Sequence, residues 1–353
     1  MGDVMIVYDF RSDTVTLPTP EMMTAVAAAP LGDSARGDDP TVNELEALAT
    51  DLTGKEDALF VPSGTMANLA AVIGHGGRGG EVIVEEDAHI FNSEGGGLSV
   101  LGGAVVRPVK GQYGVMDPDT VKAAIRGKPD LALASTRLIC LENTHNASGG
   151  SVVPLENMAA IRSVADQAGI PVHLDGARLF NAGAYLDVPV REICRHVDSV
   201  WFALCKGLGG PVGAILAGDK PFMTEARRAA KMLGGSMRQA GLIAAPALIA
   251  LRDPYSVLRR DHELAQRLAR GLASIDESLV AVDRVHTNIV NCYVDSFARD
   301  AGEINGALAS AGILANSKRT KIRFVTHYHI DEAAVDATID RFADVIQLFR
   351  KAA

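Results

Sequence analysis

Apolar and polar positions follow one another along the chain in blocks that predict strands and helices in turn. Short apolar runs bounded by turn residues, the pattern of buried strands, occur at 58–61, 81–86, 138–143, 171–175, 200–204 and 213–218. Amphipathic segments typical of helices lie at 65–75, 117–126, 154–169 and 221–233. This alternation predicts an α/β fold with a mostly parallel sheet covered by helices on both faces.

The pattern changes near residue 254. A long charged amphipathic segment at 256–275 precedes apolar runs at 288–294 and 320–329, each followed by a helical segment, the last from about Asp331. This order is typical of an α+β domain. We therefore expect an N-terminal segment 1–20, a large domain 21–254 and a smaller α+β domain 255–353.

Composition narrows the class of ligand. The 353 residues carry a formal net charge of -9, which argues against nucleic acid or an anionic membrane surface as the partner. The four cysteines have no C-x-x-C spacing, and no basic leader or long uncharged apolar run is evident. We expect a soluble cytoplasmic protein whose ligand is a small molecule.

Lys206 stands directly after a buried apolar run and before the glycine-rich turn GLGGPVG. Burial disfavours an ammonium, so a lysine there is expected to have a lowered pKa and to act as a nucleophile in Schiff-base chemistry. A lysine at the end of a strand is also typical of a side chain that reaches back to water. The stretch alone leaves both interpretations open.

Other polar residues follow strands in the same way. Asp175 ends a buried run, and Gly64 and Thr65 open a helix where their amides could face a phosphate. His89 and His145 come just past strands, where a histidine can stack on a flat cofactor or accept a proton. Each pattern is also common for structural reasons, as an N-cap or a hydrogen-bonded core histidine.

Two further motifs do not support the ligand sites that they superficially suggest. His327 and His329 alternate as strand ligands of a metal would, but no third ligand stands at a recognisable spacing, so no metal site is predicted. The segment GHGGRGG lacks the G-x-G-x-x-G fingerprint of a dinucleotide site. One cofactor would use the remaining residues together, because pyridoxal phosphate needs a lysine, an acid, a phosphate cradle and a stacking group.

Seven motifs occur in order along nearly the whole chain. They are RSDTVTLPTPEM (11–22), GDDPTVNELE (37–46), FVPSGTMAN (60–68), CLENTHN (140–146), HLDGARLFNA (173–182), CKGLGGPVGA (205–214) and KMLGGSMRQAG (231–241). Together they resemble the low-specificity L-threonine aldolases of the aromatic amino acid β-eliminating lyase group. The resemblance implies an enzyme of pyridoxal phosphate fold type I, usually a homotetramer with active sites shared between subunits.

The resemblance also implies roles in holding the cofactor. Lys206 would bond to the cofactor aldehyde, Asp175 would pair with the pyridine nitrogen, and His89 would stack on the ring. The phosphate would be held by Gly64 and Thr65 with Lys231 and Arg238 of the neighbouring subunit, and Arg178 would also line the cofactor site.

Ser12, Arg178 and Arg323 would bind the substrate carboxylate, since two guanidinium groups can hold it bidentately. They would set the Cα–Cβ bond perpendicular to the cofactor ring. A base, either His89, His145 or a water that they hold, would take the β-hydroxyl proton. The expected reaction is cleavage of L-threonine, L-allo-threonine or a related β-hydroxy-α-amino acid to glycine and an aldehyde. A β-eliminating lyase would use the same residues, whereas a pyridoxal phosphate-binding protein without turnover would not need the arginines.

The chain departs from the family pattern at three positions. Cys205 replaces the usual serine before the lysine, Leu17 replaces an arginine, and Arg36 replaces a tyrosine. Arg36 lies in a loop that approaches the substrate in the family, so it could favour a substrate with a second carboxylate, such as a β-hydroxyaspartate. The same arginine could instead lie in solvent beside neighbouring aspartates.

Overall fold

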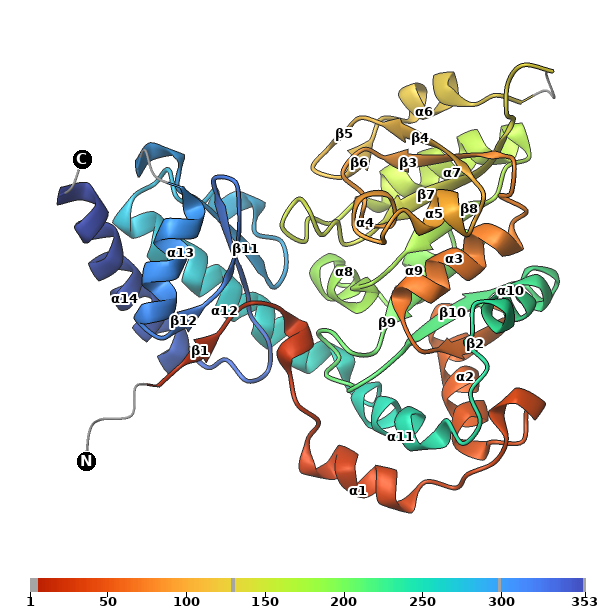
Figure 1. The fold of residues 1–353 in the computed structure, drawn as a ribbon, viewed down its shortest axis with the longest axis horizontal. Coiled ribbons are helices and arrows are strands. Elements are labelled where there is room, and N and C mark those ends of the chain that lie inside the picture. Colours follow the sequence, from red (N-terminus) through yellow and green to blue (C-terminus); the bar gives the residue numbers. More distant parts are fainter. Residues whose placement is uncertain (1–5, 128–130, 298–299, 352–353) are drawn as a thin grey trace. The chain divides into compact units, whose positions relative to one another are not determined.

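The computed structural model describes residues 6–127, 131–297 and 300–351, which form two compact units. The large unit comprises Pro18–Ser148 and Val152–Arg252. The small unit comprises the chain up to Leu17, Gly149–Ser151, and the chain from Asp253 onward. Figure 1 labels the elements of both units.

Within the part of the chain described, the large unit contains a seven-stranded sheet. Its strands, in spatial order, are β2 (Asp57–Val61), β10 (Ala214–Gly218), β9 (Ser199–Ala203), β8 (Val172–Asp175), β7 (Thr136–Glu142), β3 (Glu81–Glu85) and β4 (Val105–Val109). Neighbouring strands run parallel except that β10 is antiparallel to both β2 and β9. This sheet confirms the predicted α/β fold with mostly parallel strands.

Helices of the large unit pack on the sheet and on one another. They are α1 (Pro20–Ala28), α2 (Pro40–Thr53), α3 (Gly64–Gly74), α4 (His89–Asn92), α5 (Gly97–Val100), α6 (Pro118–Ala124), α7 (Leu155–Ala168), α8 (Leu179–Leu186), α9 (Val190–Cys194), α10 (Lys220–Met232) and α11 (Gly241–Ala250). A short hairpin of β5 (Gly111–Gln112) and β6 (Val115–Met116) follows β4. Helices α3 and α10 lie against each other and share an apolar cluster with Val61, Trp201 and Leu216 of the sheet.

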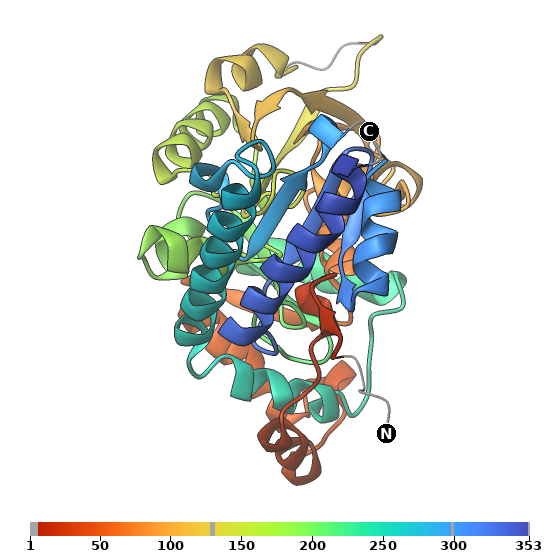
Figure 2. The ribbon, with the colours of Figure 1, turned by 90° about the vertical axis from the view of Figure 1, so that its left-hand side faces the viewer.

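The small unit is built on an antiparallel sheet, β11 (Ile289–Tyr293), β14 (Lys321–Val325) and β13 (Asn316–Lys318). Strand β1 (Tyr8–Asp9) pairs in parallel with β12 (Ile313–Leu314). Figure 2 shows α12 (Pro254–Ile275), α14 (Glu332–Lys351) and α13 (Ala301–Ser310) side by side, with α14 in contact with both others. Buried residues of the small unit form one apolar core that includes Phe10 and Phe324.

Two features of the helices bear on the sequence analysis. Asp253 caps α12 by accepting a hydrogen bond from the Ser256 amide, and Pro254 occupies the first turn, as is typical of a helix start. Among the described helices, no single one is long and apolar enough to cross a membrane, although α11 and α12 would pass that test if counted as one broken span.

Candidate active site

Asp175 is the last residue of β8 and is almost fully buried. It stands in register with Glu142 on β7 and Trp201 on β9. Its Oδ2 accepts a hydrogen bond from Asn68 Nδ2 at 2.9 Å, and its Oδ1 accepts one from the Ala177 amide at 3.1 Å. Burial, followed by the nearby Glu142 and Glu94 carboxylates, raises the pKa of Asp175 to about 7. A cation beside this carboxylate would therefore stabilise its ionised form against burial and against repulsion from Glu142 and Glu94.

Lys206 lies three residues beyond the end of β9, in a turn that Gly209 closes by donating its amide to the Lys206 carbonyl at 2.7 Å. The structure corrects one detail of the prediction, because Lys206 is half-buried rather than deeply buried. The chain has already turned out of the sheet core at Cys205, which is half-buried too. The Lys206 ammonium lies 5.6 Å from the centroid of the Trp201 ring and counteracts the rise in the Asp175 pKa.

Gly64 and Thr65 form the first turn of α3. Ser63 caps this helix by accepting a hydrogen bond from the Met66 amide at 3.3 Å, while the first amides of a helix have no partner within it. A Cβ atom on Gly64 would lie 2.2 Å from the Trp201 ring, so only glycine fits here. The helix start therefore packs directly on Trp201, and its amides are available to an anion.

His89 begins α4 and is the partly exposed histidine of the site, with 33% of its side chain accessible. Its Nδ1 lies 3.1 Å from Glu94 Oε1, and its backbone amide donates to Glu142 Oε2 at 2.6 Å. The hydrogen bond to Glu94 and the surrounding carboxylates raise the pKa of His89 despite its partial burial. Ligand-type atoms of His89, Glu94 and Asp175 lie within 4.8 Å of one another. We call His89, Glu94, Asp175 and Asn68 the Asp175 cluster.

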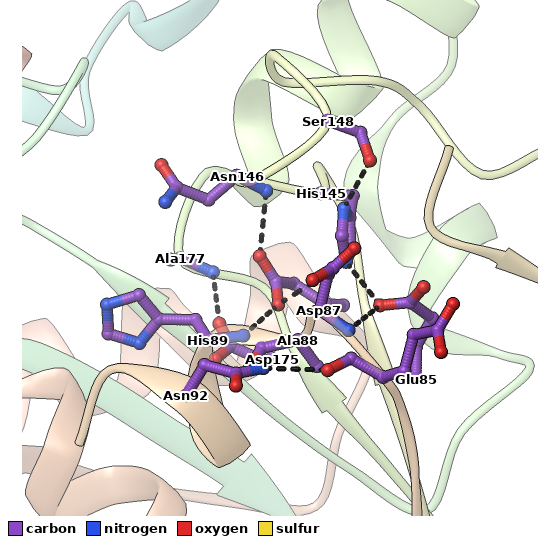
Figure 3. A network of polar contacts seen from close by, with 12 residues as sticks. Glu85, Asp87, Ala88, His89, Asn92, His145, Asn146, Ser148, Asp175 and Ala177 are labelled. Carbon is purple, nitrogen blue, oxygen red and sulfur yellow. Dashed lines mark hydrogen bonds and ion pairs between the residues drawn. The ribbon is translucent and has the colours of Figure 1, made fainter. Parts of the chain in front are cut away.

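His145 is enclosed on all sides. Its Nδ1 lies 2.9 Å from Ser148 Oγ and its Nε2 lies 3.0 Å from Glu85 Oε2, so both ring nitrogens are engaged (Figure 3). Burial opposes the charge of this ring, but the bond to Glu85 and the nearby carboxylates raise the pKa of His145. A Cβ on Gly114, in the β5–β6 hairpin, would lie 2.3 Å from His145 Cγ. In this arrangement the ring has no open nitrogen with which to accept a proton from a ligand.

The three residues expected at the substrate carboxylate fall in both units. Arg178 precedes α8 in the large unit, is buried, and donates to Asn146 Oδ1 at 3.3 Å. It also lines a small pocket with Gly207, one residue after Lys206. Ser12 and Arg323 belong to the small unit, where Ser12 Oγ accepts from the Thr14 amide at 3.2 Å and Arg323 lies on β14.

The remaining predicted residues are exposed. Arg36 Nε lies 3.5 Å from Asp33 Oδ2 with 77% of its side chain accessible, and Arg238 Nη1 lies 3.1 Å from the same oxygen. We call Asp33, Arg36 and Arg238 the Asp33 cluster. Lys231, near the end of α10, lines a pocket of about 530 Å³ that also contains Ser34. The roles predicted for Lys231 and Arg238 across a subunit boundary stay predictions.

The structure adds three residues that the sequence analysis did not select, namely Asn68, Glu94 and Trp201. Asn68 Nδ2 bridges Asp175 Oδ2 and Glu94 Oε1, at 2.9 and 2.8 Å, and Asn68 Oδ1 accepts from Trp201 Nε1 at 2.7 Å. The only sequence signal for Asn68 is its position one helical turn after Gly64, on the same face of α3.

Comparison with known proteins places this geometry in a family. The β-eliminating lyase family model matches residues 9–296. The chain is 43% identical to a probable low-specificity L-threonine aldolase 2 of Arabidopsis thaliana, over 96% of each chain. It is 39% identical to the low specificity L-threonine aldolase of Escherichia coli K12, over 91% of this chain and 94% of that one. A solved structure of Leishmania major threonine aldolase superposes with a TM-score of 0.81 at 20% identity, covering 96% and 99% of the two chains. The chain belongs to the β-eliminating lyase family.

Proposed function

We propose that this protein is a pyridoxal 5′-phosphate-dependent L-threonine aldolase, a carbon–carbon lyase. It cleaves L-threonine, L-allo-threonine or a related β-hydroxy-α-amino acid to glycine and an aldehyde. One observation carries the proposal, namely that three candidate elements of the site converge on Trp201. Its ring packs against Gly64 and lies 5.6 Å from the Lys206 ammonium, and its Nε1 donates to Asn68, the residue that donates to Asp175. The similarity to enzymes named as low-specificity L-threonine aldolases supports the choice of reaction.

The residues fit the cofactor. The Asp175 carboxylate is buried among other carboxylates and would gain from pairing with a protonated pyridine nitrogen. The α3 N-terminus, which Gly64 allows to pack closely on the Trp201 ring, presents helix amides that suit a phosphate. Lys206 supplies the amine for the aldehyde, and His89 lies beside Asp175 where it could cover one face of the ring.

Pyridoxal phosphate, when bound, supplies an electron sink for the bonding pair released from Cα–Cβ. The side chains orient the substrate and move its protons. Arg178, with Ser12 and Arg323, would hold the carboxylate and so align the bond that breaks. One proton leaves the β-hydroxyl as the aldehyde departs, and one proton returns to Cα to give glycine. We assign the first transfer to His89 or to a water that it holds, because both nitrogens of His145 are occupied.

Assembly and location are part of the proposal. We propose a cytoplasmic homotetramer, in which Lys231 and Arg238 of one subunit reach the phosphate in the next. Their exposure in the chain is compatible with that role. We further propose that residues 21–254 bind the cofactor, that 255–353 form the small domain, and that residues 1–20 contribute to the active site.

Product analysis tests the reaction. Incubation with L-threonine should yield glycine and acetaldehyde in equal amounts, whereas β-elimination would yield 2-oxobutanoate and ammonia. Lys206→Ala should abolish turnover and the visible absorbance of the cofactor-loaded protein. Lys220→Ala, at an exposed position on α10, is the matched control and should keep both. A borohydride-reducible adduct that persists in Lys206→Ala would reject the assignment of the lysine.

A further inference from the structure

A chain of hydrogen bonds runs from Asp175 into α3 and β9, and its direction is fixed at one residue. Trp201 Nε1 can only donate, so the atom of Asn68 that lies 2.7 Å from it must be the amide oxygen. The Asn68 amide nitrogen then faces the carboxylates. It donates one hydrogen to Asp175 Oδ2 and the other to Glu94 Oε1.

The next link is His173, which is fully buried on β8. Its Nε2 lies 3.1 Å from Asn68 Oδ1, an atom that can only accept, so Nε2 carries the hydrogen. Burial lowers the pKa of His173 to about 3, so the ring is neutral and Nδ1 is bare. Nδ1 therefore accepts from the Ser199 hydroxyl, which lies 2.8 Å away.

The last link is His75, at the C-terminal end of α3. With its own hydrogen given to His173, Ser199 Oγ accepts from His75 Nε2, at 2.8 Å. His75 stacks on Phe222 with ring centroids 4.2 Å apart, and burial lowers its pKa to about 4. The chain of hydrogen bonds thus runs from His75 through Ser199, His173 and Asn68 to Asp175, each residue donating to the next. Every donor along it points toward the carboxylate.

The surroundings of Asp175 give this direction a consequence. The titratable groups that face it are Glu142 and Cys140 of β7, Glu94 and His89 of the segment after β3, and Lys206 after β9. The carboxylates and burial favour the protonated acid, whereas a hydrogen bond donated to Oδ2 favours the ionised one. An aligned set of dipoles strengthens the donor at its end.

We propose that Asn68, His173, Ser199 and His75 are positioning residues that favour the ionised form of Asp175 and orient it toward the pyridine nitrogen of the cofactor. The proposal rests on the function proposed above, because it takes Asp175 as the cofactor's partner. It predicts a defined tautomer in the cofactor-free protein and a pH dependence of cofactor binding. A purely packing role for these side chains would predict neither the defined tautomer nor the pH dependence.

The first experiment uses the cofactor-free full-length protein. Imidazole ¹⁵N NMR should find His173 neutral with its hydrogen on Nε2. A hydrogen on Nδ1, or a doubly protonated ring, would overturn the proposal, because Asn68 Oδ1 or Ser199 would then be wrongly matched.

The second experiment measures the dissociation constant of pyridoxal phosphate against pH by titration of the same protein. Asn68→Leu should weaken binding roughly 10- to 100-fold near neutral pH, the effect expected for one lost hydrogen bond to a buried charge. Ser199→Ala should shift the pH profile of binding upward by up to about one unit, because Asp175 would then ionise at a higher pH. Ser199→Cys retains a weak donor and should fall between serine and alanine.

Two controls make the outcome decisive. Thr338→Val removes a hydroxyl that is fully buried in the small unit and has no hydrogen-bond partner among the described residues, so it should leave the profile unchanged. Asp175→Asn separates the two proposals. If it binds the cofactor like the parent, the assignment of Asp175 fails. If it binds poorly while Asn68→Leu and Ser199→Ala keep the parent profile, only the hydrogen-bond chain is refuted. Should Asn68→Leu not fold, the series of serine, cysteine and alanine at position 199 decides.

Discussion

The large unit contains two groups of charged side chains that contrast in burial. In the Asp175 cluster each carboxylate is withdrawn from water and has a specific neutral or cationic partner, such as Asn68 or His89. In the Asp33 cluster one half-buried carboxylate is shared by two exposed arginines. Charges in water interact weakly and are screened, whereas buried charges require their partners. The number of ion pairs in a region is therefore a poor guide to its functional weight.

The largest expected effect comes from deleting the buried carboxylate. Asp175→Ala should lower kcat/KM by about 10³-fold or more, because a charge pair in a desolvated site contributes about 4 kcal/mol or more. Asp33→Ala deletes a half-buried carboxylate of the same size, whose arginine partners are exposed, and should change kcat/KM by less than about fivefold. Steady-state kinetics with L-threonine measures both. Equal losses in the two variants would remove the contrast between the clusters.

The next effect concerns an arginine inside the protein. Arg178→Ala should raise KM and lower kcat/KM by about 30- to 1000-fold, since a charged hydrogen bond to a desolvated carboxylate contributes about 2 to 4 kcal/mol. Cofactor affinity should change less than substrate affinity. Arg238→Ala separates interior from surface: in a monomer it would be silent, and in the proposed tetramer it should weaken cofactor binding instead. Unchanged kinetics in Arg178→Ala would exclude that residue from the site.

A smaller effect should appear in the pH dependence of stability. The His145–Glu85 pair holds the pKa of Glu85 below its usual value and raises that of His145. The Glu85 contribution is present above the unfolded pKa of about 4.3 and is lost as pH falls through the lower folded value. The His145 contribution is full below about 6.5 and is lost as pH rises through the higher folded value.

The pair should therefore stabilise the fold most between about pH 4.5 and 6.5. Glu85→Gln should lower the Tm of the cofactor-free protein by the largest amount in that window, for a loss of about 1 to 2 kcal/mol. Thermal melts at several pH values test this, with Asp33→Asn, whose arginine partners are exposed, as the counterpart. A Tm difference that is the same from pH 5 to 9 would contradict the assigned partners.

The smallest effect is expected at Arg36. Its ion pair with Asp33 is exposed and should contribute about 0 to 1 kcal/mol. Arg36→Tyr should then leave the ratio of kcat/KM for an acidic and a neutral β-hydroxy amino acid unchanged. A tenfold or greater loss confined to the acidic substrate would show that Arg36 leaves Asp33 during turnover and would favour the β-hydroxyaspartate alternative.

Candidate residues with a strong local signal could be selected from the sequence. Gly64, Asp175 and Lys206 each lie at or just after the end of an apolar run, and the carboxyl ends of strands are where ligands gather in such sheets. Asn68 and Trp201 were not, since each resembles an ordinary core residue and their hydrogen bond joins positions 133 residues apart. The contrast between His89 and His145 was also hidden, because it depends on the hairpin that covers His145.

The helices and strands also divide into those that the sequence pattern predicts and those that it does not. Helix α11 was not predicted, because its residues are apolar almost throughout and include Pro246, so the sequence shows no helical periodicity there. The run at 320–329 was expected to be one strand, but β14 ends at Val325. Beyond it, His327 Nε2 donates a hydrogen bond to the Asp9 carbonyl, and His329 Nε2 accepts one from the Leu17 amide. Both rings therefore bind backbone groups of the N-terminal segment.

The contact between Gly64 and the ring of Trp201 has a consequence for how this sequence can vary. One edge of the indole sets the height of the α3 N-terminus above the sheet, and its N–H fixes the amide of Asn68. A larger residue at position 64 would lift the α3 N-terminus, where we propose that the phosphate binds, and a side chain without the indole N–H at position 201 would release the amide of Asn68. The two positions should therefore tolerate change only as a pair, and their single and double variants should be strongly non-additive.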